Sequence, residues 1–193
     1  MKKILLYILT TTLIFAQIKG STATAYVLST AVGTRFPTGT FGKEHAMGYG
    51  FNTSLYYTHS DIIPVLLFGR VDFEHYAASQ NFLKNNSTYS SVTSFLIPVS
   101  IGVKHYHPPI LTERILFLPF WEIGFVYAYS SKVYSYRQTG INDKSLYNNN
   151  FGFNIAGGLS AILFDFSIYY TYLPNNTHFG LDIRVNIPIY TRF

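Results

Sequence analysis

The chain contains no cysteine in its 193 residues. Disulfides, thiolate metal ligands and a lipid anchor attached through cysteine are therefore excluded. Charge is also scarce, since Asp, Glu, Lys and Arg make up 12% of the residues while hydrophobic residues make up 48%. Beyond residue 16 no apolar run approaches the roughly 18 residues that a membrane-spanning helix needs. The hydrophobic residues are thus dispersed along a chain with too little charge for an ordinary water-soluble surface.

The chain is instead rich in aromatic residues, and its apolar residues alternate with other residues along the sequence. It carries 17 Tyr and 17 Phe, and its last segment, 181–193, places apolar side chains at nearly every odd position. These odd positions are Leu181, Ile183, Val185, Ile187, Ile189, Thr191 and Phe193. Successive side chains of a strand point to opposite faces, and a bilayer-spanning strand needs about 9 to 11 residues. The segment therefore predicts a strand with one apolar face that is long enough to cross a membrane.

The amino end has the pattern of an export signal. Lys2 and Lys3 precede a short apolar stretch, 4–15, and Ala23-Thr24-Ala25 supplies an A-x-A cleavage site. We expect residues 1–25 to be a signal peptide and 26–193 to form one barrel domain, although cleavage nearer Ala16 or Gly20 is an alternative. Removal of the signal would leave 11 Lys and Arg against 9 Asp and Glu. No basic cluster remains, so nucleic-acid binding is not expected.

Eight alternating segments, separated by Gly, Asn, Pro and Ser, follow the signal. They cover about 26–36, 48–58, 65–76, 92–106, 116–130, 150–161, 164–172 and 181–193. The connections 37–47, 77–91 and 131–149 are long, and the connections 59–64, 107–115 and 162–163 that alternate with them are shorter. The last connection, 173–177, is a tight turn. Outer-membrane barrels have short periplasmic turns and longer outer loops. The pattern predicts an all-β fold, a transmembrane antiparallel up-and-down β-barrel of eight strands.

Three prolines fall inside these segments: Pro98, Pro119 and Pro188. Proline cannot donate a ladder hydrogen bond, and a closed barrel has no free edge. We expect these prolines to mark bulges or strand ends near a rim.

With apolar faces toward lipid, the other faces fill a lumen that at eight strands is only wide enough for side chains. The charged residues expected there are Arg35, Arg70, Asp72, Glu74, Lys104, Glu122, Asp165, Asp182 and Arg184. The tyrosines expected beside them are Tyr56, Tyr76, Tyr106, Tyr169 and Tyr190. Four cations and five anions nearly cancel, which favours a structural network of paired groups over a pore selective for one sign of ion.

The final strand, ending in Phe193 with Val185, Ile187 and Ile189 before it, resembles the outer-membrane β-barrel proteins of double-membraned bacteria. In that family such an ending is an insertion signal, so the resemblance implies recognition by the barrel-assembly machinery. The stretch from Phe36-Pro37-Thr38-Gly39 to Gly48-Tyr49-Gly50-Phe51 similarly resembles the first hairpin of the small eight-stranded members. The resemblance implies a monomer in the cell outer membrane, surrounded by outer-membrane lipid. It carries over no catalytic, cofactor-binding or metal residue.

Three functions remain open. The favoured one is a non-enzymatic structural or surface-interaction role through the loops 77–91 and 131–149, with an unknown ligand. A narrow pore for water or small solutes is the second, and an enzyme acting on outer-leaflet lipid is the third. The third would need His, Ser and an acid at the outer rim, where the loops contain only His45. His105 and His107 have no third ligand near them in sequence, so no metal or other cofactor is expected. A soluble barrel with its apolar faces around a ligand is the rival fold.

Overall fold

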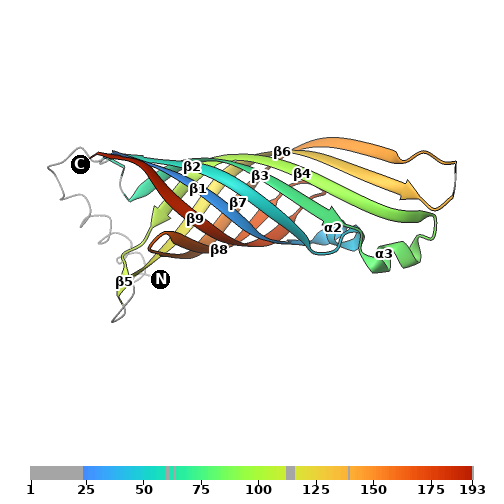
Figure 1. Ribbon diagram of the computed structural model, residues 1–193, viewed down its shortest axis with the longest axis horizontal. Coiled ribbons are helices and arrows are strands. Elements are labelled where there is room, and N and C mark those ends of the chain that lie inside the picture. Colours follow the sequence, from blue (N-terminus) through green and yellow to red (C-terminus); the bar gives the residue numbers. More distant parts are fainter. Residues whose placement is uncertain (1–23, 60, 63, 112–115, 139, 193) are drawn as a thin grey trace, which may run out of the picture.

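The computed structural model describes residues 24–59, 61–62, 64–111, 116–138 and 140–192. It is an elongated antiparallel barrel with tilted strands (Figure 1). Eight long strands form its wall: β1 (Thr24–Pro37), β2 (Gly48–His59), β3 (Val65–Ala77), β4 (Tyr89–Tyr106), β6 (Leu116–Tyr136), β7 (Lys144–Ala161), β8 (Phe164–Tyr172) and β9 (His178–Arg192). The ninth strand, β5 (Ile110–Leu111), is a two-residue pairing with the start of β6 in the β4–β6 connection.

The wall strands form a closed ring in which neighbours along the chain are also neighbours in the sheet. Neighbouring strands pair in the order β4-β3-β2-β1-β9-β8-β7-β6, and β4 also pairs with β6. The first and last strands meet along most of their length, from Thr24↔Arg192 to Pro37↔His178. The predicted eight-stranded up-and-down barrel is therefore confirmed.

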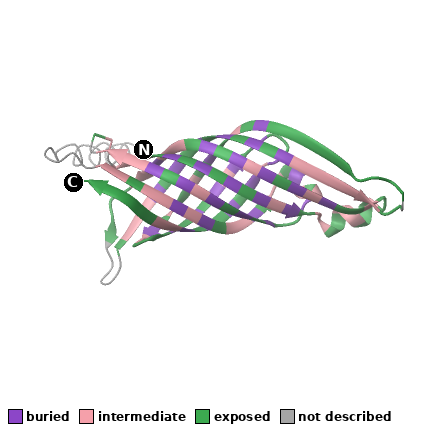
Figure 2. Cartoon of the chain, turned by 45° about the horizontal axis from the view of Figure 1, so that its top comes forward, coloured by how far each residue is buried: buried purple, intermediate pink, exposed green. Residues whose placement is uncertain are grey.

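Burial alternates along the central part of the wall strands (Figure 2). On β6, Glu122, Val126 and Ala128 are buried, whereas Ile123 and Phe125 between them are exposed. Most large apolar residues thus face outward, whereas the lumen holds small, polar and charged residues together with a few large ones such as Phe68 and Phe120. This arrangement is the reverse of a soluble ligand carrier and excludes that rival fold.

Both chain termini of the described barrel lie at one end, and we call this the inner end; the opposite end is the outer end (Figure 1). Thr24 and Ala25, the last residues of the predicted signal peptide, are the first two of β1. The rest of that signal, including Ala16 and Gly20, lies outside the described residues, so the signal stays a prediction.

The outer connections contain structure that alternation did not predict. Helices α2 (Gly39–Glu44) and α3 (Gln80–Asn85) lie in the connections that were predicted as loops 37–47 and 77–91. The predicted loop 131–149 is wrong for most of its length, because β6 and β7 continue through it and pair from Ser131↔Tyr147 to Tyr134↔Lys144. Its polar, Asn-rich composition concealed a hairpin that projects beyond the barrel wall (Figure 1). No helix in the described ranges is long and apolar enough to cross a membrane.

The proline prediction is correct at two positions and wrong at the third. Pro188 lies at a bulge, since Tyr26 pairs with Tyr190 and Val27 with Pro188, and Pro119 lies near the inner end of β6. Pro98 lies well inside β4, where the pairing with β3 stops at Val71↔Val99 and resumes in the same register at Glu74↔Leu96. One missing donor is therefore tolerated as a gap in the ladder rather than as a bulge.

The bulge at Pro188 also corrects the predicted position of Tyr190. Tyr190 was expected in the lumen, but it is 48% exposed and its ring lies 6.1 Å from that of the outward-facing Tyr26. The extra residue in β9 turns Tyr190 to the outer face.

Candidate functional site

All nine charged residues expected in the lumen lie there, each at most 8% exposed. They come from six of the eight wall strands, because each strand directs every second side chain inward. Their hydrogen bonds and ion pairs divide them into two groups, one in the outer half and one in the inner half of the barrel.

The outer cluster is built around the Arg35 guanidinium. Arg35 donates to Glu74 at 3.0 Å and to Asp182 at 2.7 Å, and lies 3.8 Å from the Asp72 carboxylate. Tyr76 donates to Glu74 at 2.9 Å, and His178 Nε2 lies 3.2 Å from the same carboxylate. The cluster therefore holds three carboxylates around one arginine and one histidine.

The inner cluster is built around the Glu122 carboxylate. Glu122 accepts hydrogen bonds from Arg70, from Arg184 at 2.7 Å and from Tyr56 at 3.0 Å. Lys104 lies 3.8 Å from Glu122 and bonds Asp165 at 2.5 Å. Three cations here surround two carboxylates, so the lumen is richer in anions toward the outer end and richer in cations toward the inner end.

An apolar plug closes the lumen above the outer cluster. Phe41 of α2 is 1% exposed and packs in a buried cluster with Tyr76, Leu96, Val126, Ala128 and Leu173. Its ring lies 4.8 Å from that of Tyr76 in an edge-on arrangement. The inward positions next to the outer mouth are thus filled by hydrophobic side chains, and α2 is held in that mouth.

His45, just after α2, fixes this plug to the wall. Its Nδ1–H donates to the Phe41 carbonyl at 3.2 Å, so Nε2 accepts the hydrogen bond from the Ser94 hydroxyl at 2.8 Å. Burial and the nearby Lys132 ammonium lower the pKa of His45 to about 4. A neutral histidine bonded to a serine is the pairing of a nucleophilic site, but both residues are 2% exposed. Glu44, the nearby acid, bonds Lys132 at 2.5 Å. The pair therefore serves to hold α2 in place.

A projecting sheet stands above the mouth on one side. It consists of the outer ends of β4, β6 and β7. In this sheet β6 extends to Tyr136 and β7 begins at Lys144. On the opposite side, β8 and β9 join through the tight turn 173–177, so the rim there is low. Tyrosines line the sheet, with Tyr89 5.2 Å from Tyr134 and 5.4 Å from Tyr136 between ring centroids.

The two edges of the projecting sheet differ. At the β4 edge, Phe82 of α3 stacks on Tyr89 with ring centroids 6.1 Å apart. At the β7 edge, pairing with β8 begins only at Phe153↔Tyr172, and residues 144–149 are all exposed. In the described part of the chain, β7 from Lys144 to Phe151 therefore has no partner strand on this side.

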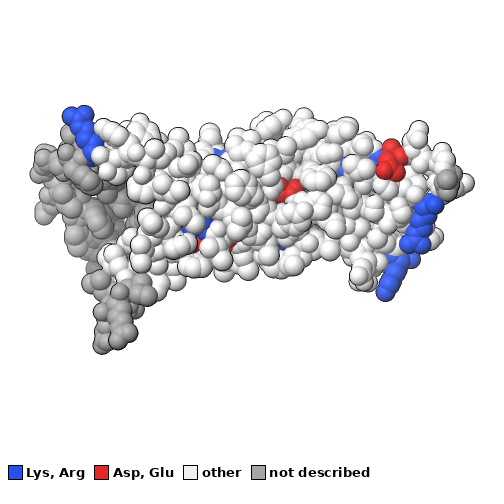
Figure 3. Space-filling view, viewed as in Figure 1, with Lys and Arg blue, Asp and Glu red and all other residues white. Residues whose placement is uncertain are grey.

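Large apolar side chains such as Phe125, Phe151 and Ile168 are exposed along the wall, where few charged groups reach the surface (Figure 3). Charged groups gather at the outer end, where the described cations are Lys43, Lys84, Lys132, Arg137 and Lys144. The predicted insertion-signal residues Ile187 and Ile189 are 51% and 59% exposed, and Val185 is half-buried. Phe193 lies outside the described residues, so the signal itself stays a prediction.

Sequence reasoning placed the charged lumen residues by period two but missed two that complete the site. His178 lies before the segment expected as the last strand, yet it is buried against Glu74. Ser94 lies on the inward face of β4, but nothing near it in sequence indicates its pairing with His45. Only the pairing of strands distant in sequence brings these partners together.

No protein-family model and no curated protein sequence matches this chain. Among solved structures, Neisserial surface protein A is similar with a TM-score of 0.52 and 16% identity, over 84% of this chain and 95% of that one. The attachment invasion locus protein Ail of Yersinia pestis gives a TM-score of 0.48 at 11% identity, over 88% and 99%. The N-terminal β-barrel domain of Pseudomonas aeruginosa OprF gives 0.43 at 14%, over 86% and 99%.

At 16% identity, the similarity to Neisserial surface protein A shows the fold alone. A closed eight-stranded barrel, with an apolar exterior and a filled polar interior, defines an outer-membrane β-barrel. This class and its location in the cell outer membrane agree with the prediction from sequence.

Proposed function

We propose that this barrel is a non-enzymatic surface protein that contacts a partner through its projecting sheet. The observation that carries the proposal is the unpartnered edge of β7 from Lys144 to Phe151. An unpaired edge presents backbone donors and acceptors to any extended chain that reaches it. A long free edge is a liability for aggregation unless it has a use, and here it stands clear of the membrane band.

The composition of this sheet supports the same proposal. Lys144, Asn148 and Tyr147 along β7 are exposed, and Tyr is an effective contact residue because it offers a large, fairly rigid surface. The lumen, in contrast, is filled by the plug and by two charge clusters, which favours a surface role over a pore. Burial of the His45–Ser94 pair likewise favours a non-enzymatic role.

Site-specific photo-crosslinking on intact cells tests the proposal. A photoreactive residue replaces Leu146, which is 45% exposed on the free-edge strand, and the matched control replaces Ile183, which is 53% exposed on the lipid-facing wall. We expect adducts with protein from position 146 and none from position 183. Equal labelling at the two positions, or none at either, would contradict a docking role for the sheet.

A further inference from the structure

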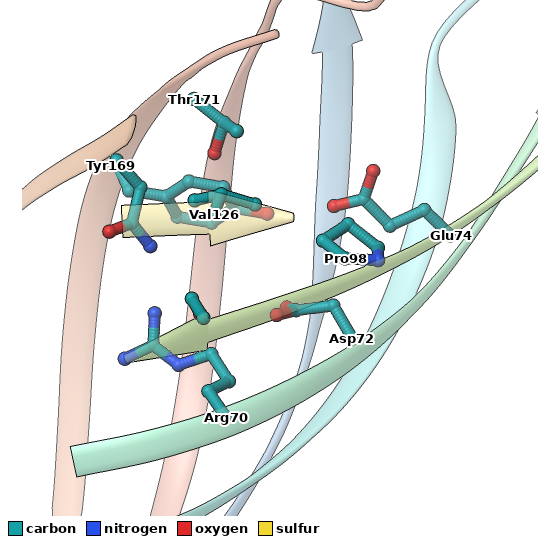
Figure 4. Close-up of a pocket in the computed structure, with 9 residues that line it drawn as sticks. Arg70, Asp72, Glu74, Pro98, Val126, Tyr169 and Thr171 are labelled. Atoms are coloured by element: carbon teal, nitrogen blue, oxygen red, sulfur yellow. The ribbon is translucent and has the colours of Figure 1, made fainter. Parts of the chain in front are cut away.

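A small cavity lies between the two charge clusters, in the middle of the lumen. It leaves about 10 Å³ for the centre of a water-sized molecule. Its lining comprises Arg70, Asp72, Glu74, Pro98, Ser100, Val126, Asn154, Tyr169 and Thr171. The cavity lies where Pro98 interrupts the pairing of β3 with β4. In Figure 4, Asp72 and Glu74 enter it from one side, and Tyr169 and Thr171 lie on the other.

Three polar groups around this space lack hydrogen-bond partners, and a carboxylate lies beside them. Ser100 Oγ, Asn154 Oδ1 and Tyr169 OH are buried without any hydrogen-bond partner among the described residues. The Asp72 carboxylate beside them is 8% exposed and lies 3.8 Å from the Arg35 guanidinium, beyond hydrogen-bond distance, with the Arg70 guanidinium also near it. Buried polar groups in folded proteins nearly always have a hydrogen-bond partner, so three without one around a single cavity indicate a missing partner.

We propose that the cavity is a binding site for one water molecule, which joins the outer and inner clusters. A water has two hydrogens to donate and accepts two hydrogen bonds. The Asp72 carboxylate and Asn154 Oδ1 are acceptors, while Ser100 and Tyr169 carry hydroxyl donors. One water therefore satisfies all four groups, and the volume is sufficient for one.

A metal ion fits this site less well than water. Arg70 lines the same cavity, so a second cation would be repelled by its guanidinium. The two clusters together hold four Lys and Arg against five carboxylates, with His178 Nε2 also 3.2 Å from Glu74. The interior therefore has little uncompensated negative charge to hold an ion.

A continuous file of waters is also disfavoured. The plug around Phe41 lies on the outer side of the cavity, and the Glu122 cluster lies on its inner side. The water bound at Asp72 is thus enclosed, and it exchanges slowly with bulk solvent.

A high-resolution crystal structure of the barrel in lipidic mesophase tests the inference. We expect one solvent peak with contacts of about 2.7 to 3.1 Å to Asp72, Ser100, Asn154 and Tyr169. An empty cavity, a row of peaks reaching either mouth, or a peak coordinated at the shorter distances of a metal ion would each overturn it.

Two matched serine variants add a second measurement. Ser100 and Ser167 both carry buried hydroxyls without partners, but only Ser100 lines the cavity. We expect Ser100→Ala to lower the occupancy of the peak and to shorten the water residence time measured by NMR cross-relaxation in nanodiscs. Ser167→Ala should leave both unchanged. Equal effects in the two variants, or an unchanged Ser100→Ala, would mean that the water does not depend on this site.

Discussion

At the scale of single residues, Glu122 is the group on which the inner cluster depends. Three cations lie within 4 Å of its carboxylate: Arg70, Lys104 and Arg184. Replacing Glu122 with Gln leaves them with Asp165 as the remaining carboxylate of the cluster. Breaking a buried ion pair in this way costs about 3 to 5 kcal/mol. We expect a loss of that size in the free energy of unfolding, measured by urea titration in lipid vesicles.

The matched control for Glu122 is Glu44→Gln. Glu44 also bonds a lysine, Lys132, at 2.5 Å, but the two side chains are 31% and 22% exposed. Exposed pairs contribute up to about 1 kcal/mol. A Glu44 variant as unstable as the Glu122 variant would show that burial does not set the strength of the network.

His45 makes the free energy of unfolding of the barrel depend on pH. Its pKa is lowered from 6.5 to about 4, chiefly by burial and secondarily by Lys132. Between these values the unfolded chain binds a proton that the folded chain does not. The stability from neutral His45 is therefore complete above pH 6.5 and is lost as pH falls toward 4, a total of about 3 kcal/mol.

The His45→Gln variant isolates this effect, since Gln is polar but does not titrate. We expect its free energy of unfolding to fall less than that of the native chain over the same pH interval, by up to about 3 kcal/mol. Parallel pH profiles for the two proteins would show that His45 titrates in the folded state as it does in solution.

At the scale of elements, alternation located the wall strands because one face of each meets lipid and the other a packed lumen. The segment expected at 164–172 matches β8 (Phe164–Tyr172) at both ends. The same signal fails beyond the membrane, where both faces of a strand meet water. There the β6–β7 extension carries Ser, Asn, Lys and Tyr on either face, and the sequence resembles a loop.

The two short helices were hidden for a different reason. Nothing local to α2 requires its one buried side chain, Phe41, to enter the barrel. That burial depends on Tyr76, Leu96 and Leu173, which come from strands or turns far away in sequence. Such contacts follow from closure of the ring, so the plug became visible only in three dimensions.

We expect the β6–β7 extension to be separable from the barrel. Lys132 and Leu146 are directly paired, so a two-residue Asn-Gly turn can join them in place of 133–145. We expect this trimmed chain to fold, with the same heat-modifiable gel mobility as the full chain, while crosslinking from position 146 disappears. If the trimmed chain does not fold, the extension is a stabilising part of the barrel and not only a contact surface.

At the scale of the whole molecule, the lumen is sealed by two barriers in series. The outer barrier is the apolar plug with Phe41, and the inner one is the Glu122 cluster. We expect no steady ion conductance in planar bilayers, and none after Phe41→Ala, because the inner barrier remains. Stepwise currents from the native chain would contradict the sealed lumen and restore the pore as a function.

The orientation of the wall toward lipid can be measured with the single tryptophan of the chain. Trp121 is 40% exposed on the outer face of β6 and stacks on His105 with ring centroids 5.4 Å apart. Its neighbour Phe120 is 3% exposed and faces the lumen. In vesicles, brominated lipids should quench Trp121 fluorescence, and aqueous acrylamide should quench it weakly.

Two further tryptophan positions extend this quenching measurement to the lumen and to the projecting sheet. In a Trp121→Phe background, Phe120→Trp places the probe in the lumen, where we expect neither quencher to reach it. In the same background, Leu146→Trp places it on the projecting sheet, where acrylamide should quench and brominated lipid should not. Because Phe120 and Trp121 are adjacent in sequence, their opposite behaviour would follow from the two faces of one strand. Equal quenching by lipid at both positions would mean that β6 does not separate a membrane from a packed interior.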